Sequence, residues 1–140
     1  MSLKTAFSMI MIDERYPQKL QHVYIDNFLK RLGYQKSFYG AENELTKYNN
    51  HVLINHLENK IEGDAIAFFS LEQFKNYENK INYSLMKQIL KSGYDLIIAM
   101  QEICLFSSGD HDLSSIIINQ SSVESRSLKE IYKAKLNKIK

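Results

Sequence analysis

The chain has few of the residues that mark a disulfide-stapled, fibrous or membrane-spanning protein. Its 140 residues include one cysteine, one proline, five glycines and no tryptophan. One cysteine cannot form an internal disulfide, which favours a cytoplasmic protein. No apolar run approaches the length of a membrane span, and no small-residue cleavage site follows the short apolar run near the amino end. We therefore expect a protein without a membrane segment.

What is present suits one folded domain. The chain is 44% hydrophobic and 24% charged, which is ordinary for a globular protein. Its net charge of +2 is unevenly spread, because residues 126–140 hold six lysine or arginine residues and one glutamate. We expect a domain over residues 1–125 and a basic helix over 126–140, packed on the domain or extending from it. Such a helix either binds a phosphate backbone or is a solvated lysine face.

Apolar patterns predict strands that alternate with helices. Pro17 suits the first turn of a helix, and Gly33 suits its C-cap. This alternation predicts an α/β fold with a mainly parallel sheet and helices on both faces. Strands are expected over residues 6–12, 34–39, 65–69 and 103–106. Helices are expected over residues 17–32 and 82–100, the second of which Gly93 could break, while residues 50–60 fit either a helix or a strand.

The most informative segment follows the last of these strands and reads Ser107-Ser-Gly-Asp110-His-Asp112. We expect that strand to run parallel to strand 6–12, adjacent or nearly adjacent to it, so that its turn lies at the carboxyl edge of the sheet beside Asp13, where open α/β sheets bind ligands. Clustered carboxylates suit a hard divalent cation. The same segment is also a good turn between two antiparallel strands.

Three segments together resemble the NYN domain, a nuclease family with a PIN-like fold. The resemblance covers about residues 5–118, and only residues 80–113 are specific. It implies a single-domain, three-layer α/β fold that cleaves RNA with Mg²⁺ or Mn²⁺. The segments are Lys80-Ile-Asn82-Tyr-Ser-Leu-Met-Lys-Gln88, Tyr94-Asp-Leu-Ile-Ile98 and Leu105-Phe-Ser-Ser-Gly-Asp110-His-Asp112.

The resemblance implies that Asp13, Asp110 and Asp112 are catalytic carboxylates that hold the metal ion and activate a water against a phosphodiester. Asn82 stands where the family has an aspartate. It is expected either at the margin of the metal site or as the cap of the helix that follows. Gln88 replaces a second aspartate, and these two losses of charge predict weakened or absent cleavage.

Two further side chains are expected to contact RNA in this interpretation. Lys80 opens the specific part of the resemblance, and His111 lies inside the acidic turn. A histidine there could reach a phosphate or donate a proton, although it could equally be an exposed turn residue.

A second interpretation comes from a different class of protein. It is a small α+β binding module with an antiparallel sheet and no catalytic activity, loosely similar to secretion chaperones or ferredoxin-like regulatory domains. Its partner would be another protein or a second copy of the chain. A strand after Asp112 would favour this module, whereas a helix there would favour the nuclease. The module needs a helix at 17–32, strands at 51–59 and 64–70, a helix at 82–92 and a hairpin across Gly109-Asp110.

Overall fold

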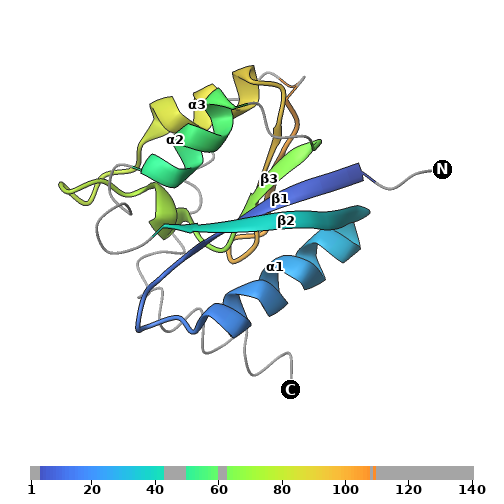
Figure 1. The fold of residues 1–140 in the computed structure, drawn as a ribbon, viewed down its shortest axis with the longest axis horizontal. Helices are drawn as coiled ribbons and strands as arrows, with labels where there is room; N and C mark the ends of the chain where they lie inside the picture. Colours follow the sequence, from blue (N-terminus) through green and yellow to red (C-terminus); the bar gives the residue numbers. More distant parts are fainter. Residues whose placement is uncertain (1–3, 43–49, 60–62, 108, 110–140) are drawn as a thin grey trace. The chain divides into compact units, whose positions relative to one another are not determined.

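The computed structural model describes residues 4–42, 50–59, 63–107 and 109. These residues form a five-stranded, mostly parallel sheet with three α-helices (Figure 1). The α/β prediction is therefore confirmed, and the antiparallel α+β alternative is wrong. The elements are β1 (Lys4–Met11), α1 (Gln18–Leu32), β2 (Tyr34–Glu42), α2 (His51–Glu58), β3 (Ala65–Phe68), the 3₁₀ helix η1 (Leu71–Phe74), α3 (Tyr83–Lys91), β4 (Asp95–Ile98) and β5 (Ile103–Leu105).

The strands lie in the order β2-β1-β3-β4-β5. β1 pairs in parallel with β2 and β3, and β3 pairs in parallel with β4, but β5 runs antiparallel to β4. The prediction that the first strand and the strand ending at Phe106 are parallel is therefore wrong. The physical reason is the short link between Ile98 and Ile103, because a parallel crossover needs a dozen or more residues.

The helices lie on both faces of the sheet, with α1 on one face and α2 and α3 on the other (Figure 1). The chain passes from β1 through α1 to β2, and then through α2 back across β1 to β3. Right-handed crossovers in opposite directions place their helices on opposite faces. The strand order reverses between β1 and β3, and open α/β sheets form a crevice at the carboxyl ends of the strands at such a point.

Helix α1 forms as its sequence predicts. Tyr24, Ile25 and Phe28 are buried, at the spacing of one apolar helix face. Gly33 ends the helix in the left-handed conformation with φ 85°, which glycine adopts without steric cost. Pro17 before the first turn and Gly33 after the last turn therefore set the two ends of the helix.

The ambiguous segment 50–60 is a helix, α2. Leu53 and Leu57, four residues apart, are its buried residues. The buried carboxylate of Glu42, at the end of β2, accepts the backbone N–H groups of Val52 at 3.0 Å and Leu53 at 2.9 Å. The first N–H groups of a helix have no partner within it, so this contact from another element favours the helix over a strand.

The predicted helix over residues 82–100 is wrong in its second half. Helix α3 ends at Lys91, and Gly93 has φ 95°. The apolar run Asp95–Ile98 is then the short strand β4, which is buried between β3 and β5. A short, fully buried strand has no polar face, so its sequence does not differ from a piece of buried helix.

A buried carboxylate joins β1, β2 and β4 to the residues that follow β5, at the amino edge of the parallel strands. Asp95 accepts the Tyr34 hydroxyl at 2.6 Å and the Ser107 backbone N–H at 2.9 Å, and its Oδ2 lies 3.9 Å from Lys4 Nζ. Burial and the bond to Asp95 raise the pKa of Tyr34. Burial, followed by the charge of Asp95, raises the pKa of the half-buried Cys104 thiol, as suits an inert cysteine.

The predicted boundary at residue 125 and the predicted basic helix over 126–140 lie outside the described residues. In the ranges that are described, no helix is both long and apolar enough to cross a membrane.

Candidate functional site at the carboxyl edge of the sheet

A cleft of about 420 Å³ opens where β1, β2 and β3 end. This is the position at which the strand order reverses. Most of its lining is charged or carries a side-chain amide, so the cleft suits a polar or charged ligand. The lining residues are Met11, Asp13, Arg15, Glu42, Glu72, Gln73, Lys75, Asn76 and Asn79.

Inside the cleft, one guanidinium joins two carboxylates that are far apart in the sequence. Arg15 Nη2 lies 2.7 Å from Asp13 Oδ2 and 2.6 Å from Glu72 Oε1. The backbone N–H of Arg15 also donates to Asp13 Oδ1 at 2.9 Å. Hydrogen bonds to Asp13 and then to Glu72 raise the pKa of Arg15. The acids that follow β1 and β3 therefore converge on a single cationic nitrogen.

The two acids and the arginine differ in their exposure. The side chains of Asp13 and Glu72 are 12% and 15% exposed, whereas the Arg15 side chain is 54% exposed. Among the described residues, Glu72 Oε2 is a buried oxygen without a hydrogen-bond partner. The neighbouring Tyr16 has its pKa raised, first by burial and then by the charge of Glu72. The two carboxylates are thus largely buried, while the Arg15 side chain that joins them is more than half exposed.

Two buried glutamines hold the backbone beneath these acids. Gln21 Nε2 donates to the carbonyl oxygens of Met11 at 2.7 Å and Tyr16 at 2.8 Å, on either side of Asp13. Gln73 Nε2 donates to the Met9 carbonyl at 2.9 Å, and its Oε1 accepts backbone N–H groups at the end of β3. Buried backbone groups need such partners, and here the partners connect α1 and η1 to the end of β1.

A hairpin over residues 75–81 forms one wall of the cleft. It is closed by an antiparallel bridge between Lys75 and Ile81. The side-chain oxygen of Asn76 accepts the backbone N–H groups of Glu78 at 3.0 Å and Lys80 at 3.2 Å. We call this segment the 75–81 hairpin.

Of the predicted site residues that fall within the described ranges, Asp13 lines this cleft. Asn82 caps α3, because its side-chain oxygen accepts the Leu85 N–H at 3.1 Å, as the alternative interpretation expected. Gln88 lies on the exposed face of α3, in a separate shallow depression. The side chain of Lys80 is 74% exposed, 3.5 Å from Glu78. Asn82 and Gln88 are thus absent from the lining.

The acidic turn itself, Asp110, His111 and Asp112, lies outside the described residues. Ser107 precedes it and bonds to Asp95 at the amino end of β4. Strand β5 therefore ends at the edge opposite the cleft, and the expectation that it ends beside Asp13 is wrong. The direction of β5 therefore gives no reason to place this turn in one site with Asp13.

Glu72 and Arg15 were missed by the sequence analysis. Glu72 follows the buried strand 65–69 closely, as Asp13 follows strand 6–12, so the rule that selected Asp13 also selects Glu72. Arg15 carries no such signal, because its position between two acids depends on the pairing of β1 with β3.

Within the described part of the chain, no three His, Cys, Asp or Glu side chains are grouped closely enough to hold a metal ion by themselves. Comparison of the chain with models of known protein families, with curated proteins and with solved structures found no match.

The capping role of Asn82 gives a first prediction. Replacing Asn82 by alanine leaves a helix N–H without its acceptor and should lower the free energy of unfolding by about 1 kcal/mol. Asn82→Asp should retain full stability, because a carboxylate accepts the same bond and interacts favourably with the helix N-terminus. Urea unfolding of the three proteins measures this difference. An alanine variant with wild-type stability but weaker Mn²⁺ binding would instead make Asn82 a ligand.

Proposed function

We propose that the chain is a metal-dependent nuclease-like domain that binds and slowly cleaves single-stranded RNA in the carboxyl-edge cleft. Asp13 and Glu72 are its metal ligands in this proposal. The observation that carries it is their convergence on Arg15 Nη2, at 2.7 and 2.6 Å. Two carboxylates that share one cationic nitrogen need only a small side-chain movement to share a metal ion, whose oxygen ligands lie at about 2.1 Å.

The donor atoms fit a hard divalent ion. Mg²⁺ is commonly held by one or two carboxylates, with waters and substrate phosphates completing its octahedral shell. Asp13 and Glu72 supply the carboxylates, and the buried Glu72 Oε2 has no hydrogen-bond partner in the described residues. When bound, Mg²⁺ or Mn²⁺ supplies an activated water and neutralises charge on the phosphodiester. With only two charged ligands, affinity for the ion is low and cleavage is slow.

Other side chains of the cleft bind the RNA in this proposal. Arg15 is more than half exposed; with a metal ion on the carboxylates, its guanidinium would bind the phosphate through its planar fork of donors. Lys75 adds a second positive charge, and the side-chain amides of Asn76 and Asn79 are positioned to bond sugar or base groups. The cleft thereby offers separate groups for the metal ion, the phosphate and the nucleoside.

The reaction is the one that the NYN resemblance implies, but Glu72 is the acid placed beside Asp13, where the resemblance implied Asp110 and Asp112. Roles in metal or RNA binding stay predictions for four further residues, Asp110, Asp112, His111 and Lys80. A cytoplasmic location and a closer relationship to PIN-like folds also stay predictions. A protein-binding role without catalysis is the alternative outcome, in which the Asp13–Arg15–Glu72 cluster only joins β1 to η1.

The direct test is cleavage of an end-labelled single-stranded RNA with Mn²⁺. We expect slow cleavage that stops when EDTA is added and is absent in Asp13→Asn. All reactions need the same salt concentration, because the basic residues 126–140 make binding to phosphates salt-dependent. Cleavage that persists in EDTA, or in Asp13→Asn purified in the same way, would come from another nuclease and would contradict the proposal.

A further inference from the structure

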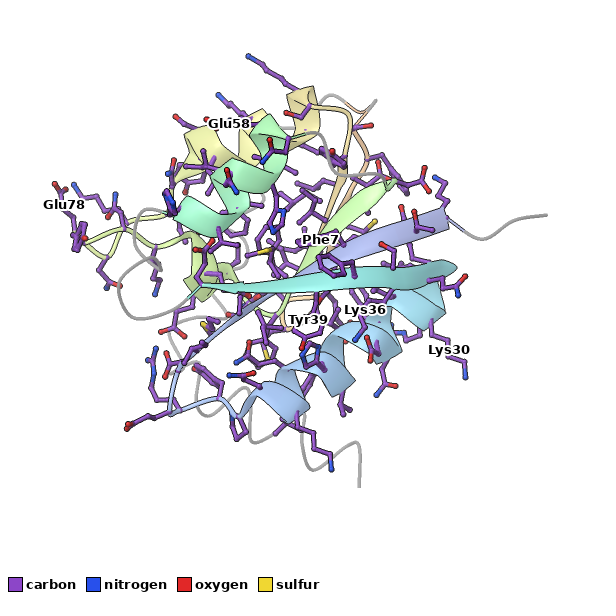
Figure 2. The ribbon with its side chains drawn as sticks, viewed as in Figure 1. Phe7, Lys30, Lys36, Tyr39, Glu58 and Glu78 are labelled. Atoms are coloured by element: carbon purple, nitrogen blue, oxygen red, sulfur yellow. The ribbon has the colours of Figure 1, made fainter. Side chains whose placement is uncertain are left out.

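The 75–81 hairpin carries the most exposed large hydrophobic side chain in the described part of the chain. Tyr77 is 78% exposed, although burial of an aromatic ring is strongly favourable. Its neighbour Glu78 lies at the tip, where the hairpin projects away from the sheet (Figure 2). An aromatic side chain that is largely exposed beside a cleft is suited to packing against a ligand.

The hairpin is rigid enough to present this ring. Besides the two bonds to the Asn76 side chain, the Asn76 N–H donates to the Lys80 carbonyl at 3.0 Å, and the Asn79 N–H donates to the Asn76 carbonyl at 2.9 Å. Asn79 has φ 62°, a conformation that asparagine adopts more readily than most residues. Because the backbone is already fixed, little entropy is lost when a ligand packs on Tyr77.

The surroundings of Tyr77 fit a nucleotide better than a protein. The residues that flank Tyr77 in the hairpin, Asn76 and Glu78, are polar or charged, whereas protein-binding surfaces are usually contiguous apolar patches. Asn76 and Asn79 line the cleft on either side of Tyr77 in the sequence, and Lys75 supplies positive charge there. Arg15 and Lys75 can contact a phosphate beside the carboxylates of this cleft, and an aromatic ring next to such basic groups is the combination that binds single-stranded nucleic acid by stacking.

We propose that Tyr77 is a stacking platform for one base of a single-stranded RNA whose neighbouring phosphate lies in the carboxyl-edge cleft. The inference rests on the proposed function, since the cleft must hold a phosphate for the next base to reach Tyr77. It adds a binding determinant that is independent of base identity, because every base has a π-face. The hairpin then selects single strands, whose bases are unstacked, over duplexes.

The experiment uses a short single-stranded RNA that contains 2-aminopurine, whose fluorescence falls on stacking. Binding is measured with Ca²⁺, so that the readout does not depend on cleavage. We expect Tyr77→Ala to weaken binding about tenfold and to abolish the quenching, while Tyr77→Phe retains both. Tyr39→Ala is the matched control, because Tyr39 is 52% exposed on β2, outside the cleft lining. Far-UV circular dichroism confirms that each variant is folded.

The inference is overturned if Tyr77→Ala binds and quenches like the wild type, or if the wild type does not bind the oligonucleotide. A protein that shows the expected stacking but does not cleave RNA with Mn²⁺ keeps this binding site and loses the nuclease function. Preference for a duplex of the same sequence would also contradict a stacking role.

Discussion

Replacing Glu72 by glutamine is expected to reduce Mn²⁺-dependent cleavage of single-stranded RNA by at least about 100-fold, the upper end of the losses seen when a partner of a metal ligand is replaced. Glutamine keeps the size of the side chain and removes one of the two charges that converge on Arg15 Nη2. Hard cations bind more weakly as charged ligands are removed. Isothermal titration should show a matching loss of Mn²⁺ affinity.

Glu58→Gln is the matched control for this substitution. Glu58 is an exposed glutamate at the end of α2 and is absent from the cleft lining (Figure 2). The same chemical change there should leave both cleavage and Mn²⁺ affinity at wild-type values. Equal activity in Glu72→Gln and Glu58→Gln would show that the Asp13–Arg15–Glu72 cluster is only a structural ion pair.

The second large effect is on stability, at the opposite edge of the sheet. Asp95→Ala should lower the free energy of unfolding by about 3 kcal/mol, because it leaves the Tyr34 hydroxyl and the Ser107 N–H without their shared acceptor, and bonds to a charged group contribute about 1.5–3 kcal/mol each. Asp95→Asn should cost less, since its amide oxygen still accepts one bond. The urea midpoint should fall while the m-value stays constant.

Asp26→Ala provides the comparison for Asp95. Asp26 is a surface acid, 48% exposed, that pairs with Lys36 at 3.1 Å, and surface substitutions of this kind change stability by about 0.5 kcal/mol or less. Folded Asp95→Ala should bind Mn²⁺ like the wild type, because Asp95 is absent from the cleft lining. An Asp95→Ala protein as stable as Asp26→Ala would contradict the role given to the buried carboxylate.

Much of the fold was predictable because its elements carry local signals. The buried strands and the Pro17 and Gly33 boundaries of α1 follow from periodicity and backbone preference. The direction of β5 did not follow, because residues 95–98 look like an extension of α3 until their neighbours in the sheet are known. Once β4 is recognised, the short link to Ile103 requires an antiparallel strand.

The candidate site was predictable only in part. An acid within a few residues of the end of a buried strand is a local pattern, and it identifies Asp13 and would have identified Glu72. The bridge through Arg15 and the support from Gln21 and Gln73 depend on which strands are neighbours, which a single sequence does not specify. For Asn82 the sequence gives a signal that fits two roles, because one short polar side chain suits both a helix cap and a metal ligand.

Paramagnetic broadening by Mn²⁺ in the ¹H–¹⁵N NMR spectrum tests the central claim most directly, because it locates the ion without requiring activity. We predict that substoichiometric Mn²⁺ first broadens the amide signals around Asp13 and Glu72, and that Glu72→Gln removes this selectivity. Uniform weak broadening, or broadening centred on Asp110 and Asp112 while Asp13 and Glu72 are unaffected, would contradict a metal site in the carboxyl-edge cleft.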